Sequence, residues 1–134
     1  MNESVRTGRP HKEFEMKYMI MMFGSAEGMM ETADPEWIRE MIGFMIQIDK
    51  DLSDSGEMVF NAGLADPGTA KLVKQTDNGV ITTDGPFAEA KESLIGYWVV
   101  DVASEERAVE ICSSIVKYAP VVELRRVQDE PPEV

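Results

Sequence analysis

The segment Asp84–Glu92 (DGPFAEAKE) concentrates the charged side chains of this sequence that are best suited to chemistry. Asp84 and Glu92 are the candidate catalytic residues, because a carboxylate removed from water can act as a general base. Lys91 stands among carboxylates that favour its protonated form, so it suits the binding of an anionic group better than Schiff-base chemistry. These residues predict acid–base chemistry on a small organic ligand.

The same segment also has a purely structural interpretation. Asp84-Gly85-Pro86 is a turn sequence, in which the carboxylate accepts hydrogen bonds from amides ahead of it and the proline sets the exit direction. Phe87 would then fold back onto the core. In the functional interpretation the turn instead presents its charged side chains, Glu89 included, at the rim of a pocket, with Phe87 as a further ligand-binding candidate. The residues alone leave both interpretations open.

Aromatic and polar residues elsewhere are further candidates for ligand binding. Tyr18 and Tyr97 lie in segments with the spacing of core strands, so their rings suit either a pocket or the interior. The ten methionines offer the same choice between an adaptable binding surface and core filler, and their spacing favours filler. Asn61 and Asp66, at the end of a predicted strand, are weaker pocket candidates.

Conventional catalytic and cofactor motifs are absent from the sequence. It has no Gly-x-Gly-x-x-Gly, no Gly-Lys-Ser/Thr phosphate loop and no His-Glu-x-x-His. The single histidine, His11, precedes the predicted domain, which argues against a histidine-dependent triad or a zinc site. The single cysteine, Cys112, stands on an apolar helix face, where we expect a buried, unreactive thiol. We therefore predict no metal site and no cofactor.

The charge and hydropathy of the chain exclude several classes of partner. A formal net charge of −12, without a cluster of Lys and Arg, argues against nucleic acid and against an anionic membrane surface. The longest apolar stretch, Tyr18–Phe23, is too short to cross a bilayer. The lack of a secretory signal at the N-terminus and of a second cysteine predicts a cytoplasmic protein.

The elements that position the candidate residues follow from apolar periodicity. We expect an N-terminal extension at 1–15, one domain at 16–127 and an acidic tail at 128–134. Asp34 and Ser104 are N-cap residues of two amphipathic helices, and Gly56 ends the first of them. The predicted strands are Lys17–Phe23, Met58–Leu64, Ala70–Thr76, Val80–Thr83, Leu94–Val102 and Val121–Val127.

This order of elements predicts a ferredoxin-like βαββαβ fold of the α+β class, with an antiparallel sheet, an extra β-hairpin and two helices on one face. The strands Lys17–Phe23 and Leu94–Val102 are apolar on both parities. Two helices cover only one face, so the other face would expose more apolar surface than a soluble monomer usually does. We therefore expect a homodimer that buries this face against a second copy.

The chain also resembles a known family. Asp84–Glu92 and the strand after it resemble the signature of the DGPF family within the YCII-related superfamily. Lys17–Gly24 is similar to the opening strand of that family and Val122–Val127 to its closing strand, while Gly63-Leu64 and Pro67 fit its middle. The resemblance implies a ferredoxin-like domain that forms a dimeric α+β barrel.

The resemblance implies less about activity. The wider superfamily resembles small dimeric enzymes that act on ring compounds. One branch of the superfamily uses a His–Asp pair, but this chain has no histidine in its first strand. Members of the DGPF family are often encoded beside extracytoplasmic-function sigma factors. Ile95 and Arg126 replace the glycine and proline that are frequent in the family, which leaves the loop and the end of the last strand less well defined by the resemblance.

Two functional hypotheses follow from these observations. The first is a pocket that binds a small organic compound, a ring or an anion, with acid–base chemistry by Asp84 or Glu92. The second is a non-catalytic accessory protein that contacts a partner such as a sigma factor, for which the acidic composition suits a basic surface.

Overall fold

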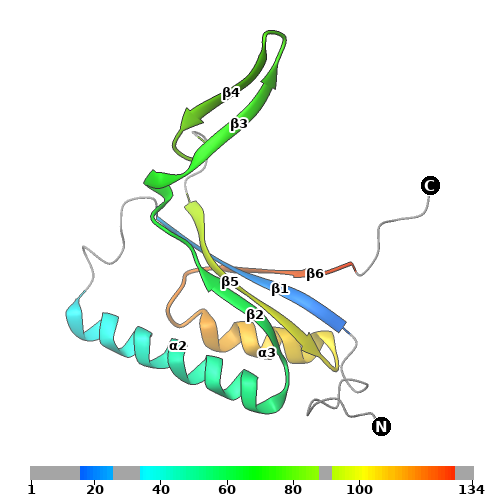
Figure 1. Cartoon of the computed structure of the whole chain (residues 1–134). Coiled ribbons are helices and arrows are strands. Elements are labelled where there is room, and N and C mark those ends of the chain that lie inside the picture. The colour runs from blue at the N-terminus through cyan, green and yellow to red at the C-terminus, as the bar shows by residue number, and fades with distance from the viewer. Residues whose placement is uncertain (1–15, 26–33, 88–91, 129–134) are drawn as a thin grey trace.

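A four-stranded antiparallel sheet with strand order β2-β5-β1-β6 lies at the centre of the structure (Figure 1). The computed structural model describes residues 16–25, 34–87 and 92–128. The strands are β1 (Met16–Ser25), β2 (Met58–Gly63), β3 (Lys71–Thr76), β4 (Gly79–Asp84), β5 (Glu92–Val102) and β6 (Val122–Arg126). The helices are α2 (Pro35–Ser55), α3 (Glu105–Ile115) and the short 3-10 helix η2 (Pro67–Thr69).

The predicted ferredoxin-like α+β class is confirmed. Both long helices lie on the same face of the sheet, below it in Figure 1. β3 and β4 form a separate two-stranded sheet, which projects from the end of the main sheet as the extra hairpin. The loop expected at Asp84–Ser93 is shorter than predicted, because Asp84 ends β4 and Glu92 begins β5. The expected N-terminal extension at 1–15 lies outside the described residues, as does the tail from 129 onward.

Helix α2 begins and ends as its cap residues predict. The side chain of Asp34 accepts a hydrogen bond from the amide of Glu36 at 3.2 Å, and Pro35 occupies the first turn. Gly56 ends the helix with φ of +82°, and its amide donates to the carbonyl of Leu52. A left-handed residue at this position favours glycine. The helix is therefore defined at both ends by chemistry that is local in sequence.

The core lies between the sheet and the two helices. Strand register places Ile20 opposite Trp98 on one side and opposite Leu124 on the other, so these side chains share the helix-facing side of the sheet. From α3, Ile111 and Ile115 pack into the same buried cluster. Burying such side chains contributes about 1.5–3 kcal/mol each, which makes this layer the main source of stability.

The other face of the main sheet has an apolar centre, with Glu123 and Arg125 of β6 at its edge, and is covered by neither α2 nor α3. We call the side chains of Met19, Met21, Phe60, Tyr97 and Val99 the open face. Phe60 is 55 % exposed and its ring lies 6.2 Å from that of Tyr97, centroid to centroid. The four other side chains are half-buried. Apolar side chains on both sides of the sheet were expected from sequence, and the homodimer inferred from them stays a prediction.

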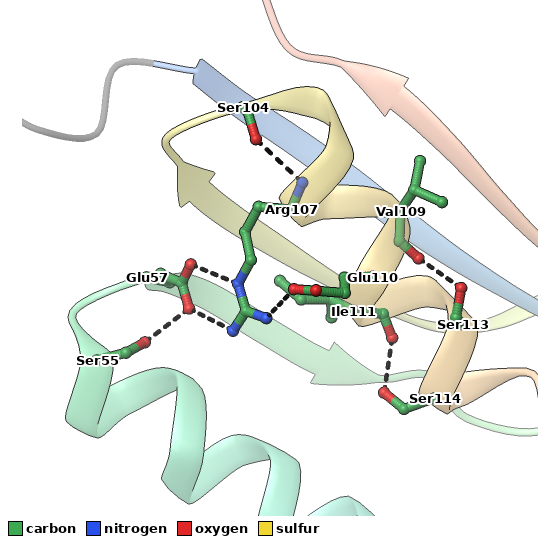
Figure 2. A network of polar contacts seen from close by, with 9 residues as sticks. All are labelled: Ser55, Glu57, Ser104, Arg107, Val109, Glu110, Ile111, Ser113 and Ser114. Carbon is green, nitrogen blue, oxygen red and sulfur yellow. Dashed lines mark hydrogen bonds and ion pairs between the residues drawn. The ribbon is translucent and has the colours of Figure 1, made fainter.

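An ion pair joins the start of α3 to the junction between α2 and β2 (Figure 2). Arg107 donates from Nε to Glu57 Oε2 and from Nη2 to Glu57 Oε1, both at 2.9 Å. The hydroxyl of Ser55 donates to Glu57 Oε1 at 2.8 Å. The hydrogen bonds from Arg107 lower the pKa of Glu57 most, and the bond from Ser55 lowers it further. Glu57 is only 5 % exposed. The same pairing raises the pKa of Arg107.

Candidate functional site

A cavity of about 500 Å³ lies where the β3–β4 hairpin joins the main sheet. Its wall is built from four stretches of chain. They are Phe23 of β1, the β2–β3 connection and the start of β3 between Leu64 and Leu72, Pro86-Phe87, and Glu92–Leu94 of β5. We call this space the hairpin cavity.

Local backbone chemistry holds the wall of the hairpin cavity in place. Asp66 caps η2, since its carboxylate accepts from the amide of Gly68 at 2.7 Å. The amide of Leu64 donates to the carbonyl of Ile95 at 2.9 Å, which ties the start of the connection to β5. On the other side, Gly85 has φ of +91° and donates its amide to Ala70 at 2.7 Å. The chain therefore bends at Gly85-Pro86 and closes the base of the hairpin, but Asp84 belongs to β4 and its carboxylate accepts from Lys71, not as the predicted turn requires.

The surface of the hairpin cavity is mostly apolar. Phe23, Leu94 and Phe87 contribute large hydrophobic side chains, and the carboxylates among its lining residues belong to Asp66 and Glu92. One oxygen of Asp66 is engaged in the cap of η2, whereas Glu92 is exposed at the first residue of β5. Ligand pockets combine such a surface with a few polar groups and have volumes of roughly 300–1,000 Å³.

Of the residues singled out in and around the motif, the structure brings Phe87 and Glu92 together in this wall. Phe87 is 67 % exposed, so the expectation that it folds back onto the core is wrong. Asp84 is not among the lining residues; its carboxylate lies on the exposed surface of β4 and accepts from Lys71 Nζ at 2.6 Å. Glu89 and Lys91 lie outside the described residues.

The two tyrosine candidates lie elsewhere. The hydroxyl of Tyr18 donates to Glu105 Oε1 at 3.1 Å, and the guanidinium of Arg126 lies 5.7 Å from the centre of its ring. Burial, with the hydrogen bond to Glu105, raises the pKa of Tyr18. The ring of Tyr97 packs against Phe60 on the open face. Neither tyrosine reaches the hairpin cavity.

A second cavity, of about 220 Å³, lies between α2 and the main sheet. Asn61 and Tyr97, both singled out from sequence, are among its lining residues, together with Met22, Met41 and Met45. We call this space the α2 cavity. Sequence reasoning missed Asp49, which also lines it, although its spacing of four residues from Met45 and eight from Met41 places all three on one helix face.

The sequence of the chain is similar to those of known proteins. The model of the YCII-related domain matches residues 16–129. The chain belongs to the YCII-related family. It is also 27 % identical over 109 residues to an uncharacterized protein of Rhizobium meliloti (strain 1021), covering 78 % of this chain and 84 % of that one. The match to the YCII-related domain spans every described strand and helix, and it includes all residues that line either cavity.

Three further features of this YCII-related domain bear on its chemistry. Among the described residues, no group of three or more His, Cys, Asp and Glu side chains is placed to hold a metal ion. Cys112 is half-buried against the core, and desolvation raises the pKa of its thiol. Within the same ranges, no helix combines the length and apolar character required to cross a membrane.

Proposed function

We propose that this YCII-related domain binds a small organic compound, with a ring or an anionic group, in the hairpin cavity. The observation that carries the proposal is the cavity itself, about 500 Å³ of mostly apolar space with Glu92 in its wall. An apolar surface favours the body of a ring compound, and the Glu92 carboxylate beside it supplies a polar contact that orients the ligand.

The motif at Asp84–Glu92 supports the same site. Phe87 and Glu92, which flank the residues outside the described ranges, both line the cavity. Lys91 directly precedes Glu92 in sequence, and we propose that its ammonium group binds the anionic group of the ligand. In a catalytic version of the proposal, Glu92 is the general base. The motif also leads us to propose that the chain belongs to the DGPF branch of the family.

The proposal is tested by titrating benzoate, an aromatic anion, into the isotopically labelled protein and following backbone amide shifts by NMR. We expect shifts at Leu94, Phe87 and neighbouring amides, and binding about tenfold weaker in Lys91→Ala, because one charge-assisted hydrogen bond is lost. Leu94→Trp, which fills the cavity, abolishes the shifts. Lys74→Ala, an exposed residue of β3, serves as the matched control.

Other small ring carboxylates, such as salicylate and nicotinate, extend the titration if benzoate itself is too small. The assignment of the site is wrong if Leu94→Trp binds these compounds as the wild type does. The role of Lys91 is wrong if Lys91→Ala binds them with unchanged affinity.

We also propose that the domain acts as a homodimer. The open face supports this, since Met19, Met21, Phe60, Tyr97 and Val99 lie on neighbouring strands. Neither α2 nor α3 covers this face of the sheet (Figure 1). Monomeric soluble proteins rarely leave such an area in water. A two-fold pairing would bring the same side chains of both copies together.

A second candidate function is that of an accessory protein that binds a basic partner, such as an extracytoplasmic-function sigma factor. The net charge of −12 favours it, because an acidic surface accelerates association with a basic one. Co-purification from native lysate at low and at high salt tests this. The accessory role predicts a basic partner that is released by salt, and recovery of the homodimer alone at both salt concentrations contradicts it.

A further inference from the structure

The α2 cavity is lined by a polar side chain that has no hydrogen-bond partner among the described residues. Asn61 pairs with Trp98 in the register of β2 and β5, so its side chain lies on the helix-facing side of the sheet, where the neighbouring strands carry apolar core residues. Asn61 is half-buried and lines the cavity. Within the described part of the chain its amide group makes no hydrogen bond. The side chain of Asn61 therefore has both donor and acceptor capacity left for a molecule bound in the cavity.

A second polar group lines the cavity from α2. Asp49 accepts a hydrogen bond from Trp98 Nε1 at 2.9 Å through its Oδ1 atom. Its other oxygen, Oδ2, accepts none from the described residues. Asp49 and Asn61 thus approach the same space from the helix and from the sheet, one with an acceptor and the other with both a donor and an acceptor.

The rest of the wall suits a flat apolar group. Met22, Met41 and Met45 contribute thioether side chains, which adapt their shape and make favourable contacts with aromatic rings. Met41 and Met45 come from α2, and Met22 comes from β1 in the sheet that α2 covers. A dry cavity of roughly 150 Å³ holds benzene. The 220 Å³ of this cavity therefore accommodates one ring with a short substituent.

We infer that the α2 cavity is a second binding site, specific for a small uncharged ring compound that bears a primary amide. The amide N–H groups of the ligand donate to Asp49 Oδ2 and Asn61 Oδ1, its carbonyl accepts from Asn61 Nδ2, and its ring contacts the three methionines. The carboxylate of Asp49 disfavours an anion at this position. The two cavities share no lining residue, so this inference does not depend on the function proposed for the hairpin cavity.

Benzamide, benzoate and toluene are the probes that test the inference, because they share a ring and differ in the polar group. The readout is the indole Nε1–H resonance of Trp98, identified in a Trp37→Phe variant that leaves it as the single indole. We expect benzamide to shift this resonance and the side-chain amide of Asn61, and benzoate and toluene to bind about tenfold more weakly.

Two variants separate this site from the hairpin cavity. Asn61→Leu, which keeps the number and branching of the side-chain heavy atoms, is expected to weaken benzamide about tenfold and to leave toluene unchanged. Glu92→Gln is expected to leave benzamide binding unchanged. The inference is overturned if saturating benzamide leaves the Trp98 indole in place, if Asn61→Leu binds benzamide as the wild type does, or if Glu92→Gln abolishes the shifts. Since the wild-type probe series needs no variant, it decides the question even if Asn61→Leu fails to fold.

Discussion

The guanidinium of Arg107 binds both carboxylate oxygens of Glu57, at 2.9 Å each, across a separation of 50 residues. Glu57 follows Gly56 at the end of α2 and directly precedes β2, and Arg107 lies in the first turn of α3, so this pair fastens the two helices at one end of the sheet (Figure 2). Because the Glu57 carboxylate is nearly inaccessible, its charge depends on Arg107 for compensation.

Removal of that compensation is expected to destabilise the fold. Breaking a buried ion pair costs about 3–5 kcal/mol, but the Arg107 side chain is 39 % exposed and water screens part of the interaction. For Arg107→Ala we expect a loss of about 2–3 kcal/mol in the free energy of unfolding, measured with urea. Glu110→Ala removes only the exposed partner of Arg107, and a loss of similar size there would refute the role of Glu57.

The same ion pair gives stability a dependence on pH. Arg107 holds the pKa of Glu57 below its usual 4.5, so the unfolded chain takes up a proton before the folded one does. The stabilisation of the fold by this ion pair is complete above pH 4.5, and it is lost as the pH falls through the pKa of Glu57 in the folded state. Urea titrations of wild type and Arg107→Ala should show the difference between their unfolding free energies narrowing in acid. A constant difference would contradict the assignment.

Two glycines are expected to respond to alanine in opposite directions. Gly85 has φ of +91°, which an L side chain adopts only with strain, so Gly85→Ala should cost about 1–2 kcal/mol. Gly43 is exposed in the middle of α2 with open space where a Cβ would lie, so Gly43→Ala should stabilise by about 0.5–1 kcal/mol. Thermal unfolding of both variants checks this, and equal shifts in Tm would show that backbone conformation is not decisive at Gly85.

The homodimer predicts a specific effect of charge on the open face. Met21 lies between Tyr97 and Glu123 in the register of the sheet. We expect a dimer for the wild type at micromolar concentration and a monomer for Met21→Glu, because a buried pairing of these faces would desolvate the new carboxylates near their symmetry mates. Val109→Glu, exposed on α3, is the control and should stay dimeric. Sedimentation velocity distinguishes monomer from dimer, and a monomeric wild type would refute the proposed homodimer.

Most of the secondary structure could be predicted because its signals are local. Asp34 and Gly56 bound α2 through hydrogen bonds that reach only a few residues along the chain. Both parities of β1 carry apolar residues, which predicts a central strand whichever strands pair with it. The ion-pair partner of a charged side chain could not be predicted, because it depends on which strands pair and in which register. Asp84 pairs with Lys71 across the hairpin, and this depends on the register of β3 and β4.

The sequence by itself determined the order of the elements, the α+β class and the two-sided apolar character of the sheet, because periodicity and capping act over single turns and strands. Only the tertiary structure decided that Phe87 and Glu92 share one cavity while Asn61 and Asp49 share another. Each cavity is the space left between segments far apart in the chain. Its shape depends on how a helix or hairpin is seated against the sheet, which no short stretch of residues encodes.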